Sequence, residues 1–153
     1  MDDINIAVLP GDGIGKEIME GCLRVLLKVQ NKTGGYSLNY KHMEAGAEYY
    51  KRTGIDITES DFLACGEADA ILFGAMGLPD VFFEDGTEIA PHLKLREAYG
   101  LYAGVRPVKA FPNTPIMLSD ERAKNIDFVI LRESTEGMFS SRGKGEIIND
   151  AIA

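Results

Sequence analysis

The chain has 153 residues, of which 45% are hydrophobic and 26% are charged, values typical of a single globular core. Its 16 lysines and arginines against 24 aspartates and glutamates give a formal net charge of −8 at pH 7. Such a surface repels nucleic acid and anionic lipid, so neither a nucleic acid nor a membrane is an expected partner. A site for an anion therefore has to be local, built from a few cations in a cleft.

The two cysteines, Cys22 and Cys65, have no motif spacing and are predicted to be buried thiols in a reducing compartment. The amino-terminal apolar run is too short for a signal peptide, and no stretch approaches the roughly 18 apolar residues of a membrane span. We therefore expect a cytoplasmic protein, or an organellar one if a targeting segment is missing from the sequence.

The first 75 residues alternate between strand-like and helix-like stretches. INIAVLPGDG predicts a buried strand running into a loop, and YSLNYKHME and DAILFGAMG predict two further strands. Between about residues 15 and 30 a helical spacing of apolar side chains predicts a helix. The members of its apolar stripe are Ile18, Cys22, Val25, Leu26 and Val29. Shorter helices are expected near residues 45–52 and 58–66, the second with Thr58 as its cap.

The remaining stretches place three arginines at the ends of predicted elements. Residues 77–90 predict a long loop, and the helix expected over residues 91–99 carries Arg96. LYAGVRPVKAF predicts a strand that contains Arg106, and IDFVILRE predicts a buried strand that contains Arg132. Strands alternating with helices indicate a parallel or mixed α/β sheet, in which ligands bind beyond the carboxyl ends of the strands.

The glycine-rich stretch PGDGIGKE fits neither common nucleotide-binding motif. Gly11 and Gly13 match the first and third positions of a Rossmann fingerprint, but Lys16 occupies the sixth, where a glycine is needed. A P-loop also fails, because Glu17 follows the lysine where a serine or threonine would bind magnesium. The simplest interpretation is a tight strand-to-helix turn capped by Asp12.

The three arginines, Arg96, Arg106 and Arg132, are the stronger signal. A guanidinium group binds a carboxylate through two parallel hydrogen bonds and stays charged when it loses water. His92 lies one turn before Arg96 on the same helical face and could reach the same ligand. The alternative is that the arginines pair with nearby acids, and the residues concerned are Glu97, Glu133 and Glu136. The residues alone leave both interpretations open.

Three stretches, LPGDGIGKE, LREAYGLYAGVRPVK and VILRESTEGMFSSRG, resemble the β-decarboxylating dehydrogenases of 2-hydroxy acids, the isocitrate/isopropylmalate dehydrogenase family. The resemblance implies an α/β fold, with the sheet and flanking helices of that family. It implies that residues 1–100 form the N-terminal part of a large domain and that residues 101–153 begin a second, dimerisation domain. Members of the family are more than twice as long, so we expect the N-terminal portion only.

The resemblance also implies a substrate and its ligands. The activity would be NAD-dependent oxidation and decarboxylation of a malate-type 2-hydroxy acid of the 3-isopropylmalate, tartrate or D-malate class. Arg96, Arg106 and Arg132, with His92, would bind this small dicarboxylate. The loop after the third strand would lie along the cofactor, and its implied contact residues are Gly77, Asp80, Glu88 and Ile89.

The cofactors implied are NAD, with NADP as the alternative, and Mg²⁺ or Mn²⁺. The catalytic lysine and metal-binding aspartates of the family lie beyond residue 153, so no metal ligand is assigned here, and we expect the 153 residues alone to be inactive. A homodimer is expected for a full-length protein. A non-catalytic anion-binding domain and an inactive fragment are the alternative interpretations.

Two positions depart from the family pattern. Phe139 stands where the family has a tyrosine that acts as an acid, so protonation of the enol would need water or another group. Before Arg96, one leucine is kept as Leu93 while His92 is polar, which favours a substrate with a smaller or more polar substituent than isopropyl.

Overall fold

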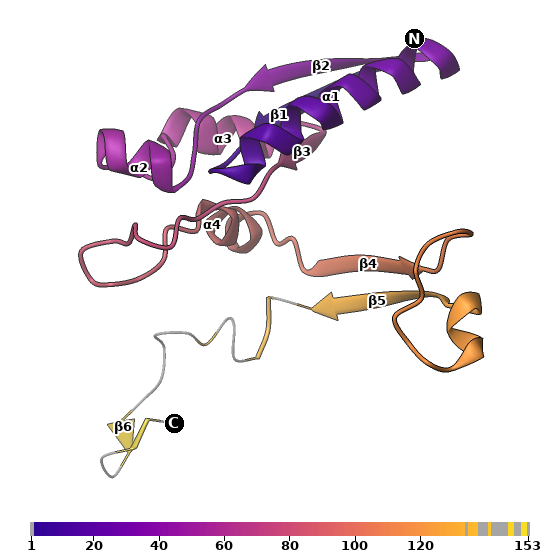
Figure 1. Ribbon diagram of the computed structural model, residues 1–153. Helices are drawn as coiled ribbons and strands as arrows, with labels where there is room; N and C mark the ends of the chain where they lie inside the picture. The colour runs from indigo at the N-terminus through magenta and orange to yellow at the C-terminus, as the bar shows by residue number, and fades with distance from the viewer. Residues whose placement is uncertain (1, 134, 138–140, 142–146, 149–150, 153) are drawn as a thin grey trace. The chain divides into compact units, whose positions relative to one another are not determined.

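The computed structural model describes residues 2–133, 135–137, 141, 147–148 and 151–152 (Figure 1). The chain divides into two compact units, Met1–Leu95 and Arg96–Ala153. The boundary falls inside a helix, α4 (Pro91–Ala98). No helix in the described part of the chain combines the length and apolar character needed to cross a bilayer.

The first unit is built on a three-stranded parallel sheet, which confirms the expected α/β class. Its strands are β1 (Asp2–Leu9), β2 (Tyr36–His42) and β3 (Ala70–Phe73), in the order β2-β1-β3. The central strand β1 is the most buried of the three, and its last four residues are all buried. The carboxyl ends of all three strands point to the same edge, where the loops that follow them converge.

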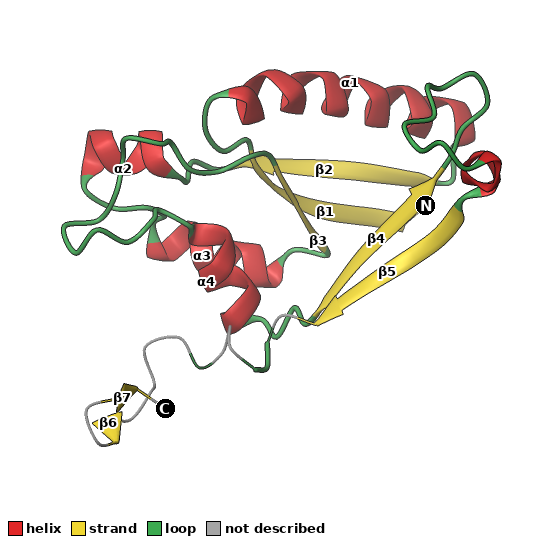
Figure 2. Ribbon diagram, turned by 60° about the horizontal axis from the view of Figure 1, so that its bottom comes forward, coloured by secondary structure: helices red, strands yellow, loops and turns green. Residues whose placement is uncertain are grey.

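Four helices belong to this unit, and they are α1 (Ile14–Thr33), α2 (Ala47–Thr53), α3 (Glu59–Glu67) and most of α4. Helix α1 lies along the sheet in Figure 2 and packs Met19 and Leu23 against Ile6 and Val8 of β1. Helix α3 begins as predicted, because the Thr58 side chain accepts a hydrogen bond of 3.0 Å from the Asp61 amide.

The predicted burial of Cys22 is wrong. The sheet contacts α1 along the line of Met19 and Leu23, while Ile18, Cys22 and Val25 lie on an exposed part of the helix surface. The apolar arc of α1 is wider than the surface that the sheet covers, so a helical period alone could not identify the buried side. Cys65 is buried as expected, with its sulfur 3.8 Å from that of Met43.

The second unit contains an antiparallel ribbon of β4 (Ala103–Lys109) and β5 (Asp127–Glu133), drawn side by side in Figure 2. A short 3₁₀ helix, η1 (Glu121–Asn125), precedes β5, and a second, two-residue pairing joins β6 (Ile147–Ile148) to β7 (Ala151–Ile152). The expectation that β5 is buried is wrong, since every residue of β5 is exposed. The two strands pair along their whole length, from Ala103 opposite Glu133 to Lys109 opposite Asp127.

Candidate functional site

The turn between β1 and α1 lies directly against the backbone that follows β3. A methyl group on Gly15 would lie 2.5 Å from the Pro10 carbonyl oxygen and 2.6 Å from that of Ala75, so only glycine fits. Side chains on Gly11 or Gly74 would collide with the same carbonyl groups, and Gly11 also has a φ of +77°. These glycines let two loops at the carboxyl edge of the sheet pack backbone to backbone.

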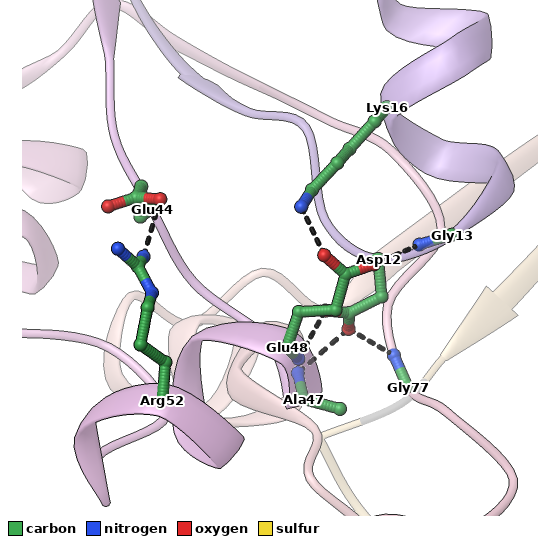
Figure 3. A network of polar contacts seen from close by, with 8 residues as sticks. All are labelled: Asp12, Gly13, Lys16, Glu44, Ala47, Glu48, Arg52 and Gly77. Atoms are coloured by element: carbon green, nitrogen blue, oxygen red, sulfur yellow. Dashed lines mark hydrogen bonds and ion pairs between the residues drawn. The ribbon is translucent and has the colours of Figure 1, made fainter.

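Asp12 joins three segments at this edge (Figure 3). Its side chain is nearly inaccessible, with 2% of the residue exposed. The carboxylate accepts hydrogen bonds from the amides of Ala47 and Glu48, each 2.8 Å, and from the amide of Gly77, 2.7 Å. A buried carboxylate is costly unless its oxygens are satisfied, and three amide donors satisfy this one.

Asp12 therefore caps a different helix from the one predicted. Gly13 is the N-cap of α1 and supplies no side-chain hydrogen bond there, whereas Asp12 bonds the first amides of α2. Glu48 of α2 contacts the start of α1 in the other direction. Its carboxylate accepts a hydrogen bond of 3.0 Å from the Gly13 amide and forms an ion pair with Lys16. The hydrogen bond from Lys16 holds the pKa of Glu48 below its usual range.

The loop from Gly77 to Ile89, implied by the resemblance to lie along the cofactor, is fixed at several points. Gly77 has a φ of +103° and bonds Asp12, and Ile89 has no exposed surface. In between, the Phe83 ring meets the ring of Tyr50 edge to face, with centroids 5.1 Å apart. The carboxylates of Asp80 and Glu88 remain exposed, as do those of Glu84 and Asp85, so a ligand could reach them.

Helix α4 is tied to the same loop. The Lys94 ammonium lies 2.6 Å from the Asp56 carboxylate and 5.4 Å from the centroid of the Phe83 ring. Two residues earlier, His92 is half-buried and stacks on Phe73 at the end of β3, with ring centroids 6.2 Å apart. The packing orients α4, the helix that carries Arg96 at its other end.

The second unit gathers the three predicted arginines. Gly104 lies opposite Arg132 across the ribbon and Arg106 lies opposite Ile130, so Gly104, Arg106 and Arg132 share one face. A methyl group on Gly104 would lie 3.5 Å from Cβ of Arg132 and 3.8 Å from Nη2 of Arg96. The Arg96 guanidinium and the base of the Arg132 side chain thus lie beside Gly104, and Arg106 lies two residues along the same face.

Arg106 is the most available of these cations. It is exposed, and among the described residues its guanidinium group has no hydrogen-bond or ion-pair partner. The Glu133 carboxylate accepts hydrogen bonds from the amides of Thr135 and Glu136 at 2.6 and 2.9 Å, and so stabilises the turn after β5. Phe139 lies outside the described residues.

A cavity of about 720 Å³ lies elsewhere in the first unit, between α1, the end of β2 and α2. Lys16, Met19, Met43, Glu48 and Tyr49 are among its lining residues, and none of the residues predicted to bind substrate or cofactor lines it. Among the described residues, no group of three or more histidine, cysteine, aspartate or glutamate side chains could hold a metal ion. Most of the predicted ligand-binding residues therefore lie on the Gly77 loop and on the ribbon face of Gly104, Arg106 and Arg132 (the arginine face).

Comparison with known proteins agrees with this arrangement. The family described as isocitrate/isopropylmalate dehydrogenase matches residues 5–151, nearly the whole chain. The chain belongs to the isocitrate/isopropylmalate dehydrogenase family. A solved β-decarboxylating dehydrogenase from Thermococcus kodakarensis, in its apo form, superimposes with a TM-score of 0.66 at 31% identity. That match covers 98% of this chain and 39% of the other.

Members of the dehydrogenase family with different names are similar to this chain. The D-malate dehydrogenase (decarboxylating) of Escherichia coli K12 is 38% identical over 144 residues, which is 94% of this chain and 40% of the relative. The 3-isopropylmalate dehydrogenase of Methanothermobacter thermautotrophicus is 40% identical over 139 residues, 91% of this chain and 37% of the relative. The chain spans about 40% of the length of these relatives.

Sequence reasoning singled out the three arginines, which the structure places around Gly104 and along one face of the ribbon, but it missed the junction at Asp12. The partners of Asp12 lie 35, 36 and 65 residues away in the chain, beyond the reach of any local motif. The one local signal was an acidic residue between two glycines, and it indicated a turn without showing which helix the carboxylate caps.

Proposed function

We propose that the protein acts in the NAD-dependent oxidation and decarboxylation of a malate-type 2-hydroxy acid, of the 3-isopropylmalate, tartrate or D-malate class. The observation that supports this most is the placement of the Arg96 guanidinium and the base of the Arg132 side chain beside Gly104, with Arg106 on the same face of the ribbon. Family membership supplies the reaction class, since relatives of this chain are named as decarboxylating dehydrogenases.

The arginines act by binding and orienting the dicarboxylate. The Arg96 guanidinium and the Arg132 side chain, which begins beside the same glycine, would bind one carboxylate, and Arg106 farther along the face would bind a second. Fixed cations also stabilise the negative charge that develops on the substrate when the carbon–carbon bond breaks and one carboxylate leaves as CO₂. His92, half-buried one turn before Arg96, would line the part of the pocket that receives the substituent on the hydroxy acid.

The Gly77 loop is the proposed contact for the nicotinamide nucleotide, which would accept the hydride when bound. Its chemistry fits, because the exposed carboxylates of Asp80 and Glu88 can accept hydrogen bonds from ribose hydroxyls, and Gly77 offers a backbone without a side chain. Ile89 supports the loop from within the core. NADP is the alternative cofactor.

A divalent cation, Mg²⁺ or Mn²⁺, is part of the proposed reaction by family resemblance. The described residues provide no group of ligands for it, so no step is assigned to it here. We also propose that the protein is cytoplasmic and has no nucleic acid or membrane partner. A chain as long as its relatives would form a homodimer. Light scattering on the protein expressed from its own gene tests the dimer.

A substrate panel tests the function. The protein expressed from its own gene is mixed with D-malate, tartrate, 3-isopropylmalate and isocitrate, with NAD or NADP, and with Mn²⁺ or a chelator. The expected result is metal-dependent NADH formation with at least one of the first three acids. Binding of these acids without turnover would instead support a non-catalytic anion-binding domain. The absence of both binding and turnover would refute the proposal.

A further inference from the structure

A single oxygen connects the start of the Gly77 loop to the start of helix α2. Oδ2 of Asp12 accepts hydrogen bonds from both the Ala47 amide, 2.8 Å, and the Gly77 amide, 2.7 Å, while Oδ1 accepts one from the Glu48 amide. A carboxylate suits the amino end of a helix, where its oxygens accept hydrogen bonds from the first free amides, and α2 holds the Asp12 side chain in this way. Gly77 is therefore held by a charge that α2 fixes in place.

The rest of the loop is attached to the same helix. Tyr50 of α2 contacts the Phe83 ring, and Phe83 in turn lies under the Lys94 ammonium, whose partner is the nearly buried Asp56. Without the bond to Asp12, the loop would keep these later contacts and lose the one at its first residue. The segment from Gly77 to Asp80 would then have to become ordered when a ligand binds.

We propose that Asp12 is a positioning residue for the nicotinamide cofactor, because it sets the course of the Gly77 loop before the cofactor arrives. The inference rests on the proposed function, which places this loop along the cofactor. A preformed loop binds more tightly than one that must be ordered on binding, since the ordering cost is subtracted from the affinity. The arginine face, which belongs to the second unit, does not depend on the hydrogen bond between Gly77 and Asp12.

The test is a graded pair of substitutions. Asp12→Ala removes all three acceptor contacts, whereas Asp12→Asn keeps one carbonyl oxygen and replaces the other by a donor that faces an amide. Hydrogen bonds to a charged group are worth enough to predict roughly ten- to hundredfold weaker NADH binding for Asp12→Ala, with Asp12→Asn between it and the wild type. The dissociation constant is measured by NADH fluorescence, below the melting temperature of every variant.

Steady-state kinetics separate positioning from general damage. We expect KM for NAD to rise in both Asp12 variants, while KM for the hydroxy acid and kcat at saturating NAD stay within about twofold of wild type. Glu48→Gln is the matched control, since it changes the same junction and the start of α1 but leaves the bond between Asp12 and Gly77. Its NADH affinity is expected to equal that of wild type.

The outcomes distinguish failure of the proposed function from failure of the positioning role of Asp12. If the wild type binds neither NADH nor NADPH, the proposed function fails. If the wild type binds NADH and both Asp12 variants bind it equally well, or if both Michaelis constants and kcat change together, the positioning role is overturned and Asp12 is only structural. Should neither variant fold, amide hydrogen exchange of the wild type decides, because the role requires the Gly77 amide to be protected without NADH.

Discussion

The two units use charged side chains in opposite ways. In the first unit Asp12 and Asp56 are 2% and 6% exposed, and each is matched by protein groups, three amides in one case and Lys94 in the other. In the second unit Arg106 lies exposed on a ribbon, without a partner among the described residues. Charges of the first kind hold the backbone in place, and charges of the second kind are available to a ligand.

The largest expected difference between the units concerns apolar side chains. Leu9 of β1 has no exposed surface, whereas Leu131 of β5 is 72% exposed. We expect Leu9→Ala to lower the free energy of unfolding by about 2–5 kcal/mol, and Leu131→Ala to change it by less than about 0.5 kcal/mol. Urea melts of both variants measure this. A loss at Leu131 as large as that at Leu9 would show that the ribbon face is covered in the intact protein.

The next prediction concerns the arginine face. Arg106→Lys keeps the charge but loses the planar fork, so a bidentate carboxylate contact is lost. A contact to a charged group is worth about 1.5–3 kcal/mol, which corresponds to a fall in kcat/KM for the hydroxy acid of roughly ten- to hundredfold. Steady-state kinetics at saturating NAD measure the fall.

Lys109→Met is the control for that experiment. Lys109 is on the same strand but on the opposite face of the ribbon, where it pairs with Asp127 at 2.6 Å. Its loss should change kcat/KM by less than about twofold, since exposed ion pairs contribute little. Equal effects of the two substitutions would mean that the arginine face does not bind the substrate.

A smaller effect is expected from the ion pair that orients α4. Lys94→Met leaves Asp56, whose side chain taken alone is 8% exposed, without its cation. Because Lys94 itself is about half exposed, water compensates in part, and we expect a loss of about 1–2 kcal/mol in unfolding free energy. Thermal melts measure it, and the double variant Asp56→Asn with Lys94→Met should recover part of the loss. A Lys94→Met protein as stable as wild type would contradict a structural role for the pair.

The smallest prediction is a pH effect at Glu48. Its pKa in the folded protein is lowered by the Lys16 hydrogen bond, so the contact stabilises the fold at neutral pH and is lost as acid protonates the carboxylate. Glu48 is 40% exposed and screened by solvent, so the contribution is about 0–1 kcal/mol. The difference in unfolding free energy between wild type and Glu48→Gln, measured at pH 7 and pH 3, should therefore shrink in acid. A difference that grows in acid would contradict a lowered pKa of Glu48 in the folded protein.

The outcome of the sequence predictions follows from the range of the interactions involved. The strands and α1 were predictable because apolar periodicity is local, and the register that places Arg106 and Arg132 on one face follows from the pairing of two neighbouring strands. Burial was less predictable, since the apolar run of β5 and the stripe through Cys22 do not show what covers them. The Asp12 junction was not predictable, because its partners come from two distant segments.

The most direct test of the central claim is to measure NADH formation and CO₂ release together. The protein expressed from its own gene is supplied with NAD, Mn²⁺ and the best acid of the substrate panel. The account predicts one CO₂ for each NADH, and a roughly ten- to hundredfold lower rate of both in Arg106→Lys at limiting substrate. NADH without CO₂, or no NADH with any malate-type acid, would contradict oxidative decarboxylation at the arginine face.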